Sequence, residues 1–297
     1  MGALVHLASY PKSGNTWVRA LFAGYFGDRE FDLDALSELD TTGGLRTLDD
    51  LLGVDPHLLQ PDELQALQPA AAHLLHAELA SHDGPVFQKL HSANVETAHG
   101  ERLFPAGTCR VLYIVRNPLD VAASWAPFFG LSLDKAVDQL ADPEIILNRR
   151  RAAHTAVVPE PLLSWSGHVR SWLDTPGLDL HVLRYEDLRA APEAAFADAL
   201  AFVGETAAPD RVAAAVEAAR FDRLQAHETE EGFVELPPIA RTPFFRRGRA
   251  GGWRDELSAA QARRVVEAHA ETMRRLGYGD AVDEVEALTE AAAPGGG

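Results

Sequence analysis

Hydrophobic residues along the chain form short continuous runs that alternate with longer amphipathic segments. The runs within 4–8, 86–90, 111–115 and 180–183 have the length of β-strands. The third run, Val-Leu-Tyr-Ile-Val, is apolar throughout, as in strands that a parallel sheet buries on both faces. Strands and helical segments that alternate in this way predict an α/β fold with a central parallel sheet flanked by helices.

Helical spacing of apolar residues defines the segments between the strands. Leucines across 27–84 indicate several short helices. Asn117 and Pro118 suit the N-cap and the first position of a helix that begins directly after the strand 111–115. Further helices are predicted over 163–173, 194–203, 209–219 and 258–276.

The segment from Glu228 to Gly252 loses this periodicity and is rich in proline, glycine and arginine, which predicts a functional loop or lid. Residues 1–289 are expected to form one domain, because a chain of 297 residues with 46% hydrophobic composition supports a single large core. The remaining residues, 290–297, are rich in glycine and are expected to be a disordered tail.

The net charge of −17 excludes a general nucleic-acid binder, since such proteins recruit a polyanion with a broad positive field. No apolar stretch reaches the roughly 18 to 20 residues that span a bilayer, so membrane insertion is not expected. A turn rich in ligand-binding residue types already begins at residue 9, which leaves no room for a secretory signal and favours a cytoplasmic protein. The single cysteine, Cys109, cannot form an intramolecular disulfide.

Residues 9–17 read Ser-Tyr-Pro-Lys-Ser-Gly-Asn-Thr-Trp and join the first strand to an amphipathic segment. A tight loop between a strand and a helix directs several main-chain N–H groups at one spot, which suits a phosphate or sulfate, and Lys12 adds a cation. The loop lacks the glycine that precedes the lysine of a Walker A motif. The alternative is an ordinary turn with Lys12 exposed to solvent.

A second candidate segment, 115–124, begins with an arginine at the end of the most apolar strand. Arg116 at this position can make paired hydrogen bonds to a phosphate, and Ser124, about two helical turns later, can supply another donor. Two alternatives remain open. Arg116 can form an ion pair with Asp120, and Ser124 can be a small residue where a helix packs closely.

A third candidate segment contains four arginines among residues 241–249, followed by Gly251 and Gly252. An anionic ligand explains such a basic cluster in an acidic chain, and the glycines allow close approach of the main chain. The alternative is a loop in which solvent surrounds the arginines.

These three segments, in this order, resemble the cytosolic-type sulfotransferase family, which transfers a sulfuryl group from 3′-phosphoadenosine 5′-phosphosulfate (PAPS) to an acceptor. The resemblance covers most of the chain and is weakest in 27–84 and 129–175. It implies a P-loop-like nucleotide-binding fold with PAPS as donor and no metal. The residues that it implies for donor binding are Lys12, Ser13, Gly14, Asn15, Thr16, Trp17, Arg116, Ser124, Tyr185, Phe221, Arg246, Arg247 and Gly248.

The family match divides these residues by the part of the donor that they would hold. The loop 12–17 would hold the 5′-phosphosulfate, whereas Arg116, Ser124 and the segment 246–248 would hold the 3′-phosphate. The residues expected at the adenine are the aromatic ones, Trp17, Tyr185 and Phe221.

The resemblance places the catalytic base at His91, directly after the strand 86–90. It also implies that Lys12 stabilises the leaving oxygen and that Lys89 stabilises the transferring sulfuryl group. Without the resemblance, His91 is more simply a surface or structural histidine, and Lys89 a strand residue whose charge reaches solvent.

Several positions depart from the family pattern. Asn15, Leu90, Ala219 and Arg220 stand where the family usually has hydroxyl side chains. Ser258, Ala259 and Arg263 depart from the dimerisation signature of many animal members. That dimer is therefore not predicted, and the oligomeric state stays open. The acceptor is expected to be a small molecule with a hydroxyl group, and the alanine-rich, acidic composition suggests a bacterial protein.

Rival interpretations come from other classes. A P-loop kinase would use ATP and magnesium, and a catalytically silent nucleotide-binding protein would need no base. The pair His73 and His76 could share a metal, although no further ligand set accompanies it. The acidic block from Glu228 to Glu235 is expected to face solvent or the acceptor. The aromatic residues that could line an acceptor pocket or belong to the core are Phe128, Phe129, Trp165 and Trp172.

Overall fold

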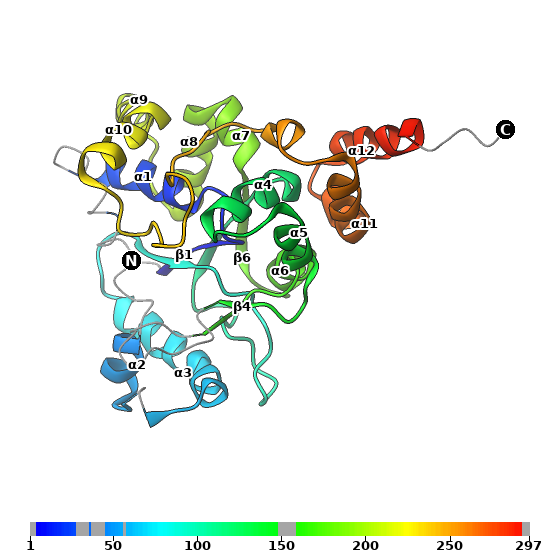
Figure 1. The fold of residues 1–297 in the computed structure, drawn as a ribbon. Helices are drawn as coiled ribbons and strands as arrows, with labels where there is room; N and C mark the ends of the chain where they lie inside the picture. The colour runs from blue at the N-terminus through cyan, green and yellow to red at the C-terminus, as the bar shows by residue number, and fades with distance from the viewer. Residues whose placement is uncertain (1–3, 28–35, 37–44, 56–57, 148–158, 293–297) are drawn as a thin grey trace.

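The computed structural model of the chain describes residues 4–27, 36, 45–55, 58–147 and 159–292. Its centre is a four-stranded parallel sheet in the order β2-β1-β3-β6 (Figure 1), which confirms the predicted fold class. The strands are β1 (Leu4–Ser9), β2 (Val86–Leu90), β3 (Arg110–Val115) and β6 (Asp179–Arg184).

Side chains of β3 alternate between the two faces of the sheet and are buried on both. Val111, Tyr113 and Val115 belong to one hydrophobic cluster, whereas Leu112 and Ile114 belong to the other. The period of two in a strand produces this division, so an uninterrupted apolar run is what a sheet covered on both sides requires.

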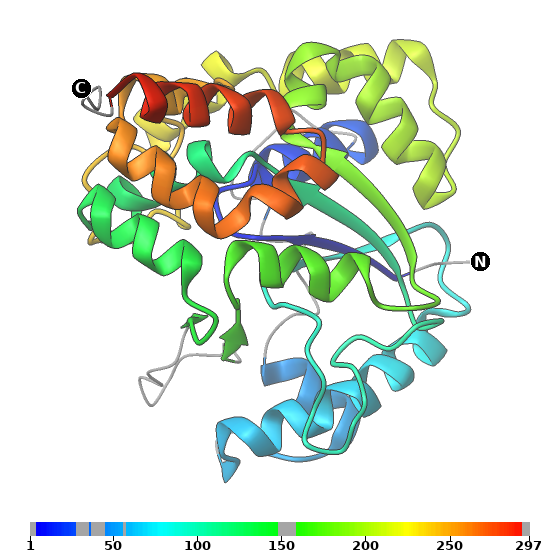
Figure 2. The ribbon, with the colours of Figure 1, turned by 90° about the vertical axis from the view of Figure 1, so that its right-hand side faces the viewer.

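Helices cover both faces (Figures 1 and 2). The cluster on the Tyr113 face includes α4 (Pro118–Phe128), α5 (Leu133–Ala141), α6 (Trp165–Leu173), α11 (Ala259–Arg275) and α12 (Gly279–Ala292). The cluster on the other face includes α1 (Asn15–Phe26), α7 (Tyr185–Ala190), α8 (Pro192–Val203), α9 (Pro209–Ala218) and α10 (Phe221–Glu231). A 3-10 helix over Gly252–Asp255 follows the arginine-rich segment.

The start of α4 follows the local signals in the sequence. The Asn117 side chain accepts a hydrogen bond from the main-chain N–H of Leu119, and Pro118 occupies the first helical turn. The predicted helices after β6 also agree with the structure, within two or three residues at each end. Cap residues thus fix where the chain leaves the sheet and turns back over it.

The helices within 27–84 differ from the sequence prediction. Within 27–84 the structure contains α2 (Leu45–Leu52) and α3 (Pro61–Leu79), so most of the predicted short helices beyond residue 60 form one long helix. The segments 28–35 and 37–44 lie outside the described residues. This helix pair lies below the sheet in both Figures 1 and 2 and has a small apolar cluster of its own.

The helices α5, α7 and α10 were not predicted from the sequence, and α10 extends to Glu231, inside the segment 228–252 that was expected to lack periodicity. The helix α12 was not predicted either. Val282 and Val285 of this helix are buried against the cluster on the Tyr113 face. Their spacing forms a short amphipathic pattern beyond Leu276, from which the helix could have been predicted. Residues 290–292 of the predicted tail belong to α12, and 293–297 lie outside the described residues.

A two-stranded antiparallel sheet joins β4 (Ile146–Leu147) to β5 (Glu160–Pro161). The main-chain N–H of Ala93 donates to the carbonyl of Pro161, which ties β5 to the segment after β2. This connection brings Glu160 to the carboxyl end of the main sheet.

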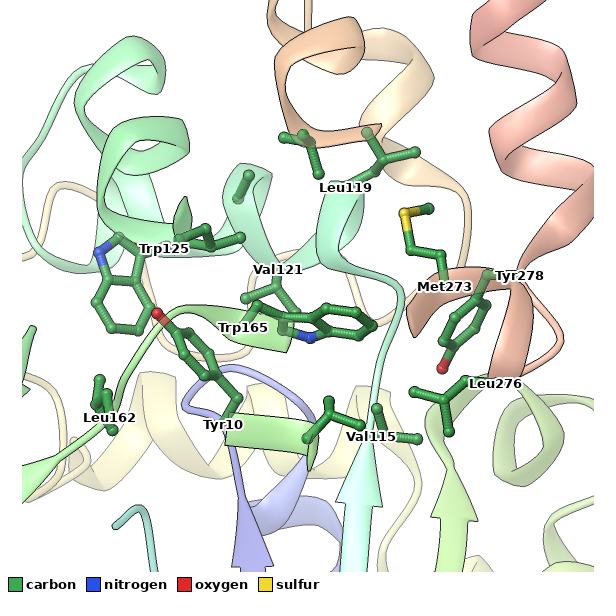
Figure 3. Packing of buried hydrophobic residues seen from close by; sticks show 14 of the residues in the cluster. Tyr10, Val115, Leu119, Val121, Trp125, Leu162, Trp165, Met273, Leu276 and Tyr278 are labelled. Carbon is green, nitrogen blue, oxygen red and sulfur yellow. The ribbon is translucent and has the colours of Figure 1, made fainter. Parts of the chain in front are cut away.

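Trp165 at the start of α6 is central to the larger cluster. Figure 3 shows its indole among side chains from β3, α4 and the C-terminal helices, including Val115, Val121 and Met273, and it is fully buried. Its large apolar surface therefore joins elements that are far apart in the sequence.

We expect Trp165→Ala to lower the free energy of unfolding by about 3 to 5 kcal/mol, because the substitution leaves a cavity that four packed elements cannot fill. Denaturant unfolding followed by circular dichroism measures this change. Leu58→Ala serves as the control, since Leu58 is 79% exposed and its loss should change the unfolding free energy by less than about 0.5 kcal/mol.

Candidate functional site

A cavity of about 560 Å³ lies where the carboxyl ends of the parallel strands meet. One residue of its wall comes from the chain just after each strand: Lys12 after β1, His91 after β2, Arg116 after β3 and Tyr185 after β6. Open α/β sheets bind ligands at this edge, because main-chain and side-chain groups from neighbouring loops converge there.

The cavity gathers almost all of the site residues that the sequence predicts, from both ends and the middle of the chain. Ser13 is the exception among them, since it is buried and does not line the cavity. The predicted residues in the wall are Lys12, Gly14, Asn15, Thr16, Trp17, Lys89, His91, Arg116, Ser124, Tyr185, Phe221, Arg246, Arg247 and Gly248.

The loop after β1 is held in a conformation that favours glycine. Gly14 has φ +102°, and a Cβ at this position would lie 2.7 Å from Cδ2 of Tyr185. The Asn15 side chain donates to the carbonyl of Leu7 at 2.7 Å and to the hydroxyl of Ser9 at 3.1 Å. The loop is thereby fastened to β1, and the N-terminal turn of α1 faces the cavity.

Lys12 extends between two aromatic rings. Its Nζ lies 3.7 Å from the centroid of Phe128 and 3.9 Å from that of Phe244, so two cation–π contacts replace part of its hydration. Burial lowers the pKa of Lys12 to about 7, and the positive charge of Arg116 acts in the same direction. An anion placed beside Lys12 would raise this pKa and so oppose both effects.

His91 is fixed at three points. Its Nδ1 lies 2.9 Å from the carbonyl oxygen of Ser9, its main-chain N–H donates to Glu160 at 3.1 Å, and its carbonyl accepts from Nε2 of His168 at 3.0 Å. The hydroxyl of Tyr113 is 2.7 Å from the other nitrogen of His168 and completes this buried network.

The contact with Ser9 determines which nitrogen of His91 carries the proton. A carbonyl oxygen only accepts, so Nδ1 holds the hydrogen and Nε2 keeps a lone pair. Burial and, to a smaller extent, the positive charge of Lys89 lower the pKa of His91 to about 3. The imidazole is therefore neutral at neutral pH and can accept a proton at Nε2.

Arg116 is oriented by main-chain carbonyls from two other segments. Its guanidinium donates to Lys12 at 3.3 Å and to Arg249 at 3.0 Å, and its Cζ lies 4.4 Å from the centroid of the Tyr185 ring. The ion pair with Asp120 that the sequence left open does not form. Asp120 is buried instead and accepts hydrogen bonds from the main chain of the glycine-rich segment 251–253.

Two arginines of the 241–249 segment, Arg246 and Arg247, line the cavity and lie against acidic residues. Arg246 makes two hydrogen bonds to Glu256, at 2.6 and 2.9 Å, and a third to the carbonyl of Ala123 at 3.1 Å. Arg247 lies 3.4 Å from Glu256 and 3.7 Å from Asp255. A bound anion would share these guanidinium groups with the carboxylates.

Gly248 allows an aromatic ring to reach the cavity wall. Its φ is +56°, and a Cβ would lie 2.1 Å from Cδ2 of Phe221. At the same side of the cavity, the Arg189 guanidinium lies 5.5 Å from the Trp17 ring, and the Trp17 indole N–H donates to the carbonyl of Ala219 at 2.9 Å. Arg189 was not predicted, because an exposed arginine in a short helix carries no pattern of its own.

The acidic block divides between solvent and the cavity wall, as expected, except for one carboxylate that is buried. Glu228 is buried and accepts from the main-chain N–H groups of Phe244 and Phe245, at 2.6 and 2.9 Å. Glu235 lines the cavity and forms ion pairs with Arg19 and Lys89. Glu235 ties the segment 228–252 to α1 and β2, and Glu228 holds two parts of this segment together, which a charge pattern alone does not reveal.

The aromatic candidates divide between wall and core. Phe128 and Phe129 line the cavity, with Leu147 and Glu160 beside them, whereas Trp165 and Trp172 are fully buried in the core. Within the described ranges, three or more His, Cys, Asp or Glu side chains do not gather into a possible metal site. Over those same ranges, every helix is too short or too polar to cross a membrane.

Comparison with known proteins gives one family. A family model described as "Sulfotransferase domain" matches residues 4–277. The chain is 26% identical to flavonol 3-sulfotransferase of Flaveria bidentis over 267 residues, which covers 84% of this chain and 75% of that protein. It is 27% identical to cytosolic sulfotransferase 12 of Arabidopsis thaliana over 271 residues, with coverages of 87% and 74%.

Solved structures share the fold at lower identity. The mouse sulfotransferase SULT7A1 complexed with PAP superposes with a TM-score of 0.57 at 18% identity, over 95% of this chain and 88% of that one. Retinol dehydratase in a complex with retinol and PAP gives 0.56 at 18% identity, over 91% and 81%.

We expect nitrogen NMR of the His91 ring to show the Nδ1–H tautomer and no titration between pH 5 and 8. The physical reason for the low pKa of about 3 is burial together with the positive charge of Lys89, while the Ser9 carbonyl fixes the tautomer. Free histidine added to the same sample titrates in this range and provides the control. A His91 signal that titrates in this range would contradict the assigned environment.

Proposed function

The chain belongs to the sulfotransferase domain family and is a sulfotransferase, and on this premise we propose that it moves a sulfuryl group from PAPS to a hydroxyl of a small-molecule acceptor with His91 as base. One observation carries the proposal. A neutral imidazole with a lone pair at Nε2 and a set of cationic side chains line the same cavity, although they come from distant parts of the sequence.

The cavity wall fits a doubly anionic adenosine nucleotide. Lys12, Arg116 and Arg247 supply cationic groups, and the absence of a side chain at Gly14 and Gly248 lets the rings of Tyr185 and Phe221 reach the cavity wall. When bound, PAPS supplies the sulfuryl group and the phosphate oxygen that leaves from it. The loop 12–17 would hold the 5′-phosphosulfate, as in the family match.

The 3′-phosphate would lie at the opposite side of the nucleotide. Arg116, Ser124 and the segment 246–248 would hold it, and this phosphate would separate PAPS from ATP. Tyr185 and Phe221 would contact the adenine together with Trp17. Ala219 and Arg220 depart from the family pattern and supply no hydroxyl to the adenine, and the carbonyl of Ala219 accepts from Trp17.

His91 would take the proton of the acceptor hydroxyl as that oxygen attacks sulfur, a role worth roughly 10² to 10⁴ in rate. Lys12 and the N–H groups of the loop would stabilise charge on the leaving oxygen, and Lys89 would stabilise the sulfuryl group. Transfer of this kind proceeds through a loose, in-line transition state, so alignment and charge stabilisation are the main tasks of the protein. A divalent metal is not part of the proposal.

The acceptor would enter beside His91. Phe128, Phe129 and Leu147 give this side of the cavity an apolar wall, which suits a hydroxyl on an apolar or aromatic molecule. The relatives' names concern their own substrates, so the acceptor of this chain is proposed only as a class. A cytoplasmic location, a single domain over 1–289 and a bacterial source remain predictions from the sequence.

His91→Ala should lower transfer from PAPS by roughly 10² to 10⁴ and leave the affinity for PAP within about threefold, because the base acts on the acceptor and not on the nucleotide. Mass spectrometry of 4-nitrophenol, or of cell extract, incubated with PAPS measures the gain of one sulfuryl group, and calorimetry measures PAP binding.

Two further variants separate the roles. Arg116→Ala should weaken PAP binding by about tenfold or more, since it removes charge-assisted hydrogen bonds to phosphate. His99→Ala, which changes an exposed histidine, should leave both readouts unchanged. Full activity of His91→Ala would remove His91 from the mechanism, and transfer from ATP in place of PAPS would favour a kinase.

PAP binding should take up a proton at Lys12. Without ligand the pKa of Lys12 is about 7, and a phosphate beside the ammonium raises it. Lys12 therefore takes up a substantial fraction of a proton when PAP binds at pH 8, and almost none below about pH 6, where it is already protonated. The affinity for PAP consequently falls as pH rises from 7 to 9. Calorimetry at pH 8 in two buffers of different ionisation enthalpy measures the uptake. The same uptake in Lys12→Met would contradict this assignment.

A further inference from the structure

The carboxylate of Glu235 forms an ion pair with Lys89, the lysine that the proposed function assigns to the sulfuryl group. Its Oε1 lies 3.2 Å from Nζ of Lys89 and 2.6 Å from the Arg19 guanidinium, and Oε2 lies 3.5 Å from the hydroxyl of Thr16. Burial alone would raise the pKa of Glu235, but Lys89 and Arg19 lower it to about 2. The carboxylate is therefore an ionised group in the cavity wall.

Arg19 is the fixed partner of this carboxylate. It is fully buried in α1, and its guanidinium also donates to Thr16 at 3.2 Å and to the carbonyl of Leu36 at 3.3 Å. Removing the carboxylate from a buried guanidinium is strongly unfavourable, so Glu235 is expected to stay in place when a ligand binds.

Lys89 is the partner that a ligand can share. Its side chain is 19% exposed, it lines the cavity, and it is two residues before His91. An anionic sulfuryl group at this ammonium would therefore meet Glu235 on the other side of the same charge. Like charges that share one cation oppose each other, and the partly enclosed site weakens solvent screening of this repulsion.

We propose that Glu235 is the resident counter-ion of Lys89 and sets how strongly the site prefers PAPS to PAP. The inference rests on the proposed function, because it takes the sulfuryl group to lie at Lys89. Glu235 lowers the affinity for PAPS, which carries that group, and has little effect on PAP, which lacks it.

Glu235 also acts as counter-ion of Lys89 after the sulfuryl group has been transferred. Transfer removes the sulfuryl group from the donor, and Lys89 then keeps Glu235 as a partner instead of becoming an uncompensated charge in the cavity. Tight binding of the sulfuryl group before transfer would stabilise the ground state without helping the transition state. Glu235 therefore limits ground-state binding at the position where the group must leave.

The test compares the affinities of PAPS and PAP by calorimetry, without any acceptor. Glu235→Gln keeps the shape of the side chain and an acceptor oxygen for Arg19 but removes the negative charge. We expect this variant to bind PAPS about tenfold more tightly and PAP within about twofold of the unmodified chain. Glu230→Gln makes the same charge change at an exposed position nearby and should alter neither affinity.

Lys89 provides the second arm. Lys89→Met should bind PAPS more weakly, and adding Glu235→Gln to it should recover little of the affinity, because the carboxylate acts through the shared ammonium. If Glu235 has only a structural role, Glu235→Gln should change the affinity for PAPS equally with and without Lys89→Met. It should also change the affinity for PAP along with that for PAPS. If Glu235→Gln does not fold, Arg19→Met with Glu235→Gln removes both buried charges, and the same rise in the preference for PAPS is expected.

Unchanged or weaker PAPS binding by a folded Glu235→Gln variant that still binds PAP would overturn the inference and leave the proposed function intact. An equal gain in the Lys89→Met background would also overturn it. Failure of the unmodified chain to bind PAP or PAPS would overturn the proposed function itself, so the two failures are distinguishable.

Discussion

The alignment of four parallel strand ends is the constraint on which the site depends. Ala8 pairs with Leu90, Ser9 with Ile114, and Val115 with Arg184, so the strands stop at nearly the same level. Each following residue then enters the same space without any long loop to place it. The apolar clusters on both faces fix the register, since a shift of one residue would exchange the buried faces of every strand. The packing of the core and the geometry of the cavity are in this sense one property.

This acidic chain has a cavity lined by basic side chains. The net charge is −17, yet the cavity wall contains two lysines and several arginines. Many of these cations already contact carboxylates, as Arg246 contacts Glu256, and others contact aromatic rings or main-chain carbonyls. Such partners reduce the cost of holding like charges together before a ligand arrives. They also hold each guanidinium in a defined direction, which favours recognition by shape as well as by charge.

The sequence predicts the parts of this structure that local signals encode. The apolar run at β3, the cap at Asn117 and the glycine-bearing loop near Lys12 each identify an element by spacing or residue type, and the structure brings them together as the family match implies. The long-range pairings were not predictable. Glu228 and Glu235 belong to an acidic block that the sequence assigns to solvent or to the acceptor, and only the folded chain shows which N–H groups or cations they meet. The helix α12 was missed because its apolar positions are few and follow a segment that already seemed to end the fold.

Gly248 and Phe221 illustrate how such a cavity constrains variation. The ring of Phe221 occupies the volume where any side chain at 248 would begin, so the two positions form a single packing unit although they belong to different elements. Glycine should therefore persist at 248 in natural homologues that keep an aromatic ring at 221, because any side chain there would meet the ring and would also strain a main chain with φ +56°. Invariance at 248 would then record the shape of the cavity in the evolutionary history of the chain.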